Sequence, residues 1–199
     1  MNDNTVEFKP GDQAIWDGTG HKYNVLHNIV YVDKFEKSDN PVQKVVLSSS
    51  EINDEGCYLI DKGYYVHTSH LFPIPTGKLD TNVTITSEHK KAAKKSLNTR
   101  WYKIANAPDC EAMETIHDST DCALCVKFHE IKQFPNDYGK RKCACPLRNG
   151  DPTTKRDCCD EYFEWQDYVS GNHYLHSLRY AWCIVDMLER IRDWKGDKE

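Results

Sequence analysis

Cys122-Ala123-Leu124-Cys125 opens a stretch of 38 residues that holds six of the nine cysteines in the chain. The stretch continues through Cys143-Ala144-Cys145-Pro146 and closes with Cys158-Cys159. Two cysteines from one turn and two from later loops can converge on a tetrahedral ion, each thiolate about 2.3 Å from the metal. The loops between them are polar and bury little, so a metal would supply folding free energy that they lack. The spacing predicts a structural zinc site.

Not every cysteine in this stretch can bind the same ion. Cys143 and Cys145 are too close in sequence for both to be comfortable ligands, and the same holds for Cys158 and Cys159. The predicted ligands are Cys122, Cys125, Cys145 and Cys158. The residues that can substitute for them are Cys143, Cys159 and His129.

Disulfide bonds and a catalytic thiol pair are the two alternatives to zinc. The N-terminal residues 1–7 contain no apolar run and no signal peptide, so we expect a reducing, cytoplasmic location in which thiols persist. A redox pair would need a Cys-x-x-Cys at a helix start within a thioredoxin-like pattern, and none surrounds Cys122. Both alternatives are therefore less favoured than zinc.

The composition indicates a soluble protein of one large or two small domains. The chain has 199 residues, of which 39% are hydrophobic and 29% charged, and its mean hydropathy is -0.74. No apolar run approaches the ~20 residues that span a bilayer, so we expect no membrane association. The net charge of -5 argues mildly against nucleic acid as the main partner.

Charge is distributed unevenly along the chain. Residues 1–80 carry a net charge of -5, residues 81–105 carry +5, and residues 106–199 carry -5. The basic part contains Lys90, Lys91, Lys94, Lys95, Arg100 and Lys103. Two acidic modules thus flank a basic connector, which is either a solvated helix face or a nucleic-acid contact.

The first 75 residues have the pattern of a small antiparallel β-barrel. Candidate strands lie at residues 13–16, 23–35, 43–47, 57–60 and 64–67, separated by Gly, Asp and Asn turns. A short helical turn within residues 68–75 would bring Leu71 and Phe72 into the core. The aromatic residues Trp16, Tyr64 and Tyr65 either pack this barrel or line a peptide or nucleic-acid groove.

Two motifs of this segment carry a family resemblance. They are Phe8-Lys9-Pro10-Gly11-Asp12 before the first strand and Tyr65-Val66-His67-Thr68-Ser69-His70-Leu71 at the end. With these motifs the segment resembles SH3-like barrels, including the KOW-type ones. The resemblance implies a binding module, with no particular ligand.

The rest of the chain reads as linker and helices. Residues 76–86 look like a linker, and Ser87 can cap a helix with Ala93, Leu97, Trp101 and Ile104 on one face. Further helices are predicted at 110–118, at 160–169, and from Asn172 as cap to about residue 194. The predicted inward positions of the last helix are Leu175, Leu178, Ala181, Trp182, Val185, Leu188 and Ile191.

The predicted fold is therefore α+β: an SH3-like barrel (1–75), a linker and basic helix start (76–99), and a Cys-rich, mainly helical zinc domain (100–199). No Gly-rich phosphate loop, His-Glu-x-x-His helix or nucleophile elbow occurs in the sequence. We therefore expect a protein that is not an enzyme.

The second half carries its own resemblance. The pattern consists of Trp101, Cys122-Ala123-Leu124-Cys125, Cys145-Pro146-Leu147, Cys158, Tyr162 and Trp165, followed by a helix. Over residues 100–195 it resembles a functionally unassigned family of small Cys-rich proteins of tailed phages.

The resemblance leads to an expected role in an infected cell. We expect a phage accessory protein in the host cytoplasm that acts by binding a host protein; the sharper form of this hypothesis is an inhibitor of a host enzyme or defence system. The alternative is a nucleic-acid-binding protein that uses the basic connector and the basic residues of the metal loops. Those loop residues are Lys140, Arg141, Lys142, Arg148, Lys155 and Arg156.

Overall fold

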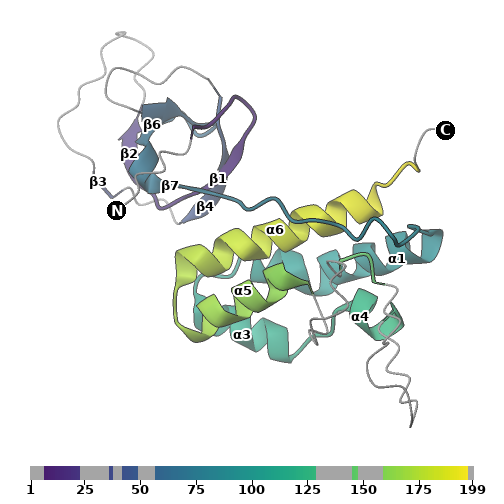
Figure 1. The fold of residues 1–199 in the computed structure, drawn as a ribbon. Coiled ribbons are helices and arrows are strands. Elements are labelled where there is room, and N and C mark those ends of the chain that lie inside the picture. The colour runs from purple at the N-terminus through teal and green to yellow at the C-terminus, as the bar shows by residue number, and fades with distance from the viewer. Residues whose placement is uncertain are drawn as a thin grey trace. The chain divides into compact units, whose positions relative to one another are not determined.

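The computed structural model describes residues 7–22, 36–37, 42–48, 57–128, 145–147 and 159–196. The chain divides into two compact units, Met1–Ile74 and Pro75–Glu199. The first contains small antiparallel sheets and the second contains helices, so the fold is mixed α+β (Figure 1). No helix in the described ranges has both the length and the apolar character needed to cross a bilayer.

The N-terminal unit is built from two antiparallel sheets. The first has the strand order β4-β1-β7, formed by Gln43–Val46, Gln13–Trp16 and Leu71–Pro73. The second has the order β3-β2-β6-β5, formed by Glu36–Lys37, Thr19–Lys22, Tyr64–His67 and Cys57–Leu59. An isolated bridge connects Leu47, which follows β4 of one sheet, to Ile60, which follows β5 of the other.

Four of the predicted strands are present at or within one residue of the expected bounds. The fifth, residues 23–35, lies outside the described residues. Within the part of the chain that is described, the two sheets do not close into a barrel. The SH3-like barrel therefore stays a prediction, while the antiparallel β character is confirmed.

The core of this unit is aromatic and aliphatic. Trp16 is completely buried, and its indole Nε1 donates to the carbonyl of Thr19 at 2.7 Å. The rings of Trp16 and Tyr64 lie 5.0 Å apart. The short 3-10 helix η1 (Thr68–His70) then leads Leu71 into the core, while Phe72 is half-buried. Trp16 thus packs the core and does not line a groove.

The second unit begins with one continuous helical run. It consists of α1 (Ser87–Ser96), a π-helical turn η2 (Leu97–Trp101) and α2 (Tyr102–Ile104). The predicted inward face is confirmed, because Ala93, Leu97, Trp101 and Ile104 are all buried. The remaining helices are α3 (Cys110–Asp118), α4 (Ala123–Phe128), α5 (Asp160–Ser170) and α6 (Tyr174–Arg192).

The predicted helix caps were wrong at two starts. Thr86, not Ser87, caps α1: its hydroxyl accepts from the amide of His89, and His89 Nδ1 accepts from the amide of Thr86 at 3.1 Å. This is a capping box with histidine as the third helical residue. At the start of α6, Asn172 has a φ of 57° and forms the left-handed turn, while His173 holds the cap position.

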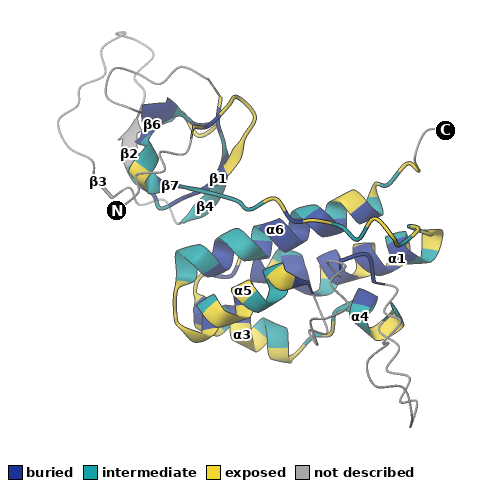
Figure 2. Ribbon diagram, viewed as in Figure 1, coloured by how far each residue is buried: buried dark blue, intermediate teal, exposed yellow. Residues whose placement is uncertain are grey.

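Helix α6 is the central element of this unit and packs against both α1 and α5. Its buried residues cover more than one face, as the dark blue in Figure 2 shows. The predicted inward residues Leu175 and Trp182 are only half-buried, whereas Cys183, Ile184 and Met187 are fully covered. Burial raises the pKa of the Cys183 thiol to about 12.

The segment predicted as a linker lies against the helices of its own unit. Gly77 is buried, and a Cβ added to it would lie 2.1 Å from Met187 Sδ and 3.0 Å from Cys183 Sγ on α6. The carbonyl of Gly77 accepts from the guanidinium of Arg190, and the amide of Asp80 donates to the carbonyl of Pro146 at 2.8 Å. Residues 77–80 have no regular secondary structure, but hydrogen bonds hold Gly77 to Arg190 of α6 and Asp80 to Pro146.

We predict that Gly77→Ala destabilises the helical unit by about 1–3 kcal/mol, the range for an extra methyl group in a packed site. Met187 can change rotamer, but it is itself fully buried and has little room. Urea unfolding followed by circular dichroism at 222 nm measures the change. Thr76→Ala, at the exposed neighbouring position, is the control. Equal midpoints for the two variants would contradict this close packing.

Candidate metal centre

Cys122 and Cys125 lie on either side of the first turn of α4. The amide of Val126 donates to the carbonyl of Cys122 at 3.0 Å, which closes this turn. The Cys122 and Cys125 side chains share a hydrogen bond, and this contact together with burial raises the pKa of the Cys122 thiol well above its ordinary value. The structure therefore brings this pair of predicted ligands together at one end of a helix.

Ser96, the last residue of α1, holds the Cys122–Cys125 segment in place. Its hydroxyl lies 3.6 Å from Cys122 Sγ and accepts from the amide of Leu124 at 3.4 Å. Ser96 and Leu124 are both fully buried. Because α4 begins at Ala123, Ser96 supplies from another helix the hydrogen bond that a cap residue would normally supply.

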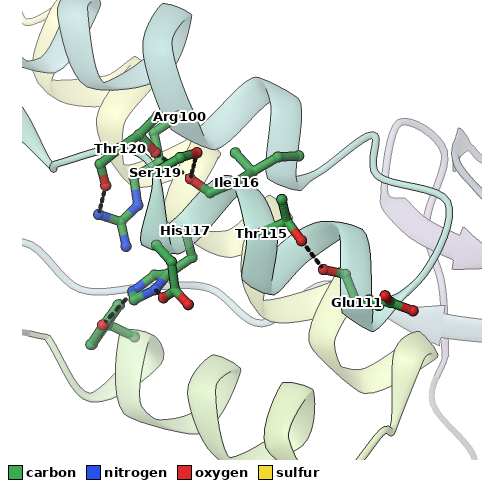
Figure 3. Close-up of polar contacts among 9 residues, drawn as sticks. Arg100, Glu111, Thr115, Ile116, His117, Ser119 and Thr120 are labelled. Atoms are coloured by element: carbon green, nitrogen blue, oxygen red, sulfur yellow. Dashed lines mark hydrogen bonds and ion pairs between the residues drawn. The ribbon is translucent and has the colours of Figure 1, made fainter.

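Arg100, one turn after Ser96, holds the residues just before Cys122. Its Nη1 donates to the carbonyl of Thr120 at 2.8 Å (Figure 3). The end of α3 is ordered in turn, because the carbonyl of Ile116 accepts from Thr120 Oγ1 at 2.6 Å and from Ser119 Oγ at 3.1 Å. One face of the α1–η2 run thus positions residues 120–124.

Cys159 lies on the same pocket as the Cys122–Cys125 pair. This pocket has a volume of about 650 Å³, and aromatic and aliphatic side chains such as Trp101, Leu147 and Tyr162 form much of its wall. Cys159 is 1% exposed and immediately precedes α5. It is one of the predicted substitute ligands.

Cys145 is also buried, with 4% of its surface exposed, two residues before the pocket residue Leu147. Cys158, the fourth predicted ligand, and the substitutes Cys143 and His129 lie outside the described residues. Among the residues that are described, no three His, Cys, Asp or Glu side chains gather closely enough to hold a metal ion. The ligand set therefore stays a prediction, with Cys122 and Cys125 as its converging members.

The seven cysteines in the described ranges form no disulfide bonds. They are Cys57, Cys110, Cys122, Cys125, Cys145, Cys159 and Cys183. Besides Cys122 and Cys183, Cys110 has a raised thiol pKa, caused mainly by burial. A raised pKa leaves less thiolate at neutral pH and makes a thiol a weaker nucleophile.

His117 is a pocket residue that no sequence motif singled out. Its Nε2 lies 2.7 Å from the hydroxyl of Tyr162, and its Nδ1 lies 3.0 Å from a carboxylate oxygen of Asp118. Figure 3 shows His117 near the end of α3, beside Arg100 and Thr120. Both ring nitrogens already have partners, so His117 braces α3 against α5 in this arrangement.

A second hollow lies between α1 and α4 and has a volume of about 770 Å³. Its wall includes Lys91 and Lys95 of the basic connector, and Val126 and Lys127 of α4. Val126 is 71% exposed, the most prominent apolar side chain on the surface of the described residues. Lys127 and Lys91 both pair with Glu88, and these contacts, led by the one with Lys127, lower the pKa of the Glu88 carboxyl.

We predict that Ser96→Ala destabilises the start of α4 by about 1 kcal/mol, because the buried amide of Leu124 loses its acceptor. Hydrogen exchange at residues 122–126 should accelerate more than exchange in α5. Ser87→Ala is the matched control, since Ser87 is exposed and Thr86 caps α1. Unchanged exchange in the Ser96 variant would show that α4 does not depend on this hydroxyl.

Comparison with protein-family models, with curated proteins and with solved structures finds no match for this chain.

Proposed function

We propose that this chain is a phage accessory protein that acts by binding a host protein, and that zinc stabilises its helical unit. The observation that carries the metal part is the convergence of Cys122 and Cys125, whose side chains share a hydrogen bond and line the same pocket as the buried Cys159. The phage origin rests on the resemblance of residues 100–195 to small Cys-rich proteins of tailed phages. A host enzyme or defence system is the proposed class of target.

The chemistry of the donor set suits zinc. Two thiolates bound to one tetrahedral ion lie about 3.8 Å apart if each bond is about 2.3 Å long, a separation that two hydrogen-bonded thiols nearly have already. Cys122 and Cys125 would hold the ion with Cys145 and with one member of the Cys158-Cys159 pair. When bound, the ion would join segments distant in sequence and add its binding free energy to folding.

A binding role agrees better than catalysis with the thiols that are described. The pKa values of Cys110, Cys122 and Cys183 are all raised, so these thiols are weak nucleophiles without a metal. Ser96 and Arg100 hold the Cys122 segment rigidly from one helix face. Thiols with a raised pKa are typically unreactive rather than catalytic, and a metal ion that bound them would displace their protons.

The hollow between α1 and α4 is the proposed contact surface for the partner. It combines the exposed Val126 with Lys91, Lys95 and Lys127. A protein segment with an apolar side chain flanked by carboxylates would complement this surface in both shape and charge. Lys95 is the lysine best placed to meet such a carboxylate, because Lys91 and Lys127 share Glu88.

Nucleic acid is the second candidate partner, favoured by the exposed side chains of Lys91, Lys94 and Lys95 along α1. The basic face of this helix is smaller than the sequence indicated, because some of its lysines already have partners within the chain. Lys90 donates to the carbonyl of Trp194, and Lys91 pairs with Glu88 at 3.2 Å. The basic residues at 140–142, 148, 155 and 156 lie outside the described residues.

Protein purified without added zinc should contain about one zinc ion per chain. Cys122→Ser should lose that ion and the cooperative unfolding of the helices, because one of the four ligands is missing. Metal analysis and thermal melts at 222 nm, with and without a chelator, measure both effects.

Cys57→Ser is the control for the cysteine variant, since Cys57 is buried in β5 of the other unit. Its cost should be an ordinary one, about 1 kcal/mol. If Cys122→Ser melts like the parent and the chelator changes nothing, the cysteine cluster is not a metal site.

Capture from nuclease-treated host lysate tests the partner and the surface together. The parent protein should retain a specific host protein, and Val126→Glu should lose it by placing a negative charge in the hollow. Thr115→Glu, which adds the same charge at an exposed position of α3, should retain it. A partner that is captured from untreated lysate but not from nuclease-treated lysate, or binding that falls steeply with salt, would favour the nucleic-acid candidate.

A further inference from the structure

Arg100 carries a buried positive charge that no carboxylate in the described part of the chain neutralises. Only 6% of its surface is exposed. Its Nη1 donates to the Thr120 carbonyl, and its guanidinium lies 5.4 Å from the centroid of the Trp101 ring. Its Nε has no hydrogen-bond partner within the described ranges. Burying a cation and an N–H donor in this way costs folding free energy unless an anion or a hydrogen-bond acceptor lies next to them.

Neither acidic residue on the pocket explains this charge. Arg100 shares the pocket with Asp118 and Asp121. The side chain of Asp118 is 81% exposed and pairs with His117. Asp121 is exposed as well, so solvent screens both carboxylates. The pocket groups that metal binding would make negative are the thiols of Cys122 and Cys125, which are partly buried, and of Cys159, which is buried.

A second unpaired donor points to the same need for an acceptor. The indole Nε1 of Trp101 is buried and has no hydrogen-bond partner among the described residues. Trp101 follows Arg100 directly and lies on the same pocket as the three cysteines. Two neighbouring residues with unpaired N–H groups therefore line the same pocket as three thiols, whose sulfurs accept hydrogen bonds once they are deprotonated.

We infer that Arg100 is the counter-charge of the cysteine centre: its guanidinium neutralises the thiolates that form on metal binding and donates from Nε to one of their sulfurs. This inference rests on the proposed zinc site. Four thiolates around one divalent ion leave a net charge of about -2, which a buried guanidinium offsets better than a screened surface lysine. Because Nη1 is already bound to Thr120, the same side chain positions the segment that carries Cys122.

Arg100 is thus a positioning residue for the metal centre, and its effect should appear in metal affinity. Outer partners of metal ligands typically change affinity by about 10–100-fold. Arg100→Gln should weaken zinc binding by about that factor, measured by competition with a chromophoric chelator. Arg100→Lys keeps the positive charge but loses the planar guanidinium. Its zinc affinity should therefore lie between those of the parent and Arg100→Gln. Lys103→Gln, an exposed position in the same helical run, should bind like the parent.

Cobalt substitution separates charge compensation from simple support of Thr120. The thiolate-to-cobalt absorption band reports the electron density on sulfur, so Arg100→Gln should shift it, while Lys103→Gln should not. Equal affinity and an identical band in the parent and Arg100→Gln would overturn the role of Arg100 and leave the zinc site intact. Absence of any metal binding by the parent would overturn the zinc site and this inference together.

A measurement on the parent protein covers the case in which Arg100→Gln does not fold. The Nε–H resonance of Arg100 in a nitrogen–proton correlation spectrum should move when zinc is added to the metal-free protein. The chemical shift should change in the direction that is typical of an N–H group gaining a hydrogen-bond acceptor. If the resonance stays in place while the thiols bind zinc, Arg100 does not contact the thiolates and the inference fails.

Discussion

The packing of α6 against α1 and α5 is the contact on which the helical unit depends. Its apolar residues, among them Ile184, Met187 and Leu188, are fully covered. The parts that carry cysteines are added to this core: α4 packs on α1, and Cys159 leads into α5. Burial of apolar surface thus builds the frame, and the proposed metal would join the additions that bury little themselves.

Local signals explain why several elements could be predicted closely. The bounds of β1, β6 and α3 agree with those expected from the sequence, because hydrophobic periodicity and turn residues act over a few positions. The caps were missed because a cap depends on its partner. Thr86 and Ser87 are both hydroxyl residues, and only the contact with His89 distinguishes them.

The closeness of Cys122 and Cys125 could be predicted from the sequence, but the residues that support this pair could not. The Cys-x-x-Cys spacing predicts that Cys122 and Cys125 lie close together. The supporting contacts, in contrast, join segments that are far apart in the sequence. Ser96 meets Cys122 across 26 positions, Arg100 meets Thr120 across 20, and His117 meets Tyr162 across 45. No sequence periodicity encodes such long-range pairs. From the sequence alone, Arg100 could therefore be interpreted only as one member of a basic stretch.

The π-helical turn η2 lets this part of the chain carry one residue more than a regular helix without changing how its two flanks face the rest of the unit. The amide of Tyr102 reaches the carbonyl of Leu97, five residues back, whereas an α-helical hydrogen bond reaches four residues back. Removing one residue here would convert the run to a regular helix and leave α1 and α2 facing α6 as they do now. Removing one residue from the middle of α1 would instead rotate everything that follows by about 100° relative to what precedes it. Natural variants of this chain are therefore expected to tolerate the loss of one residue within 97–101 but not within α1.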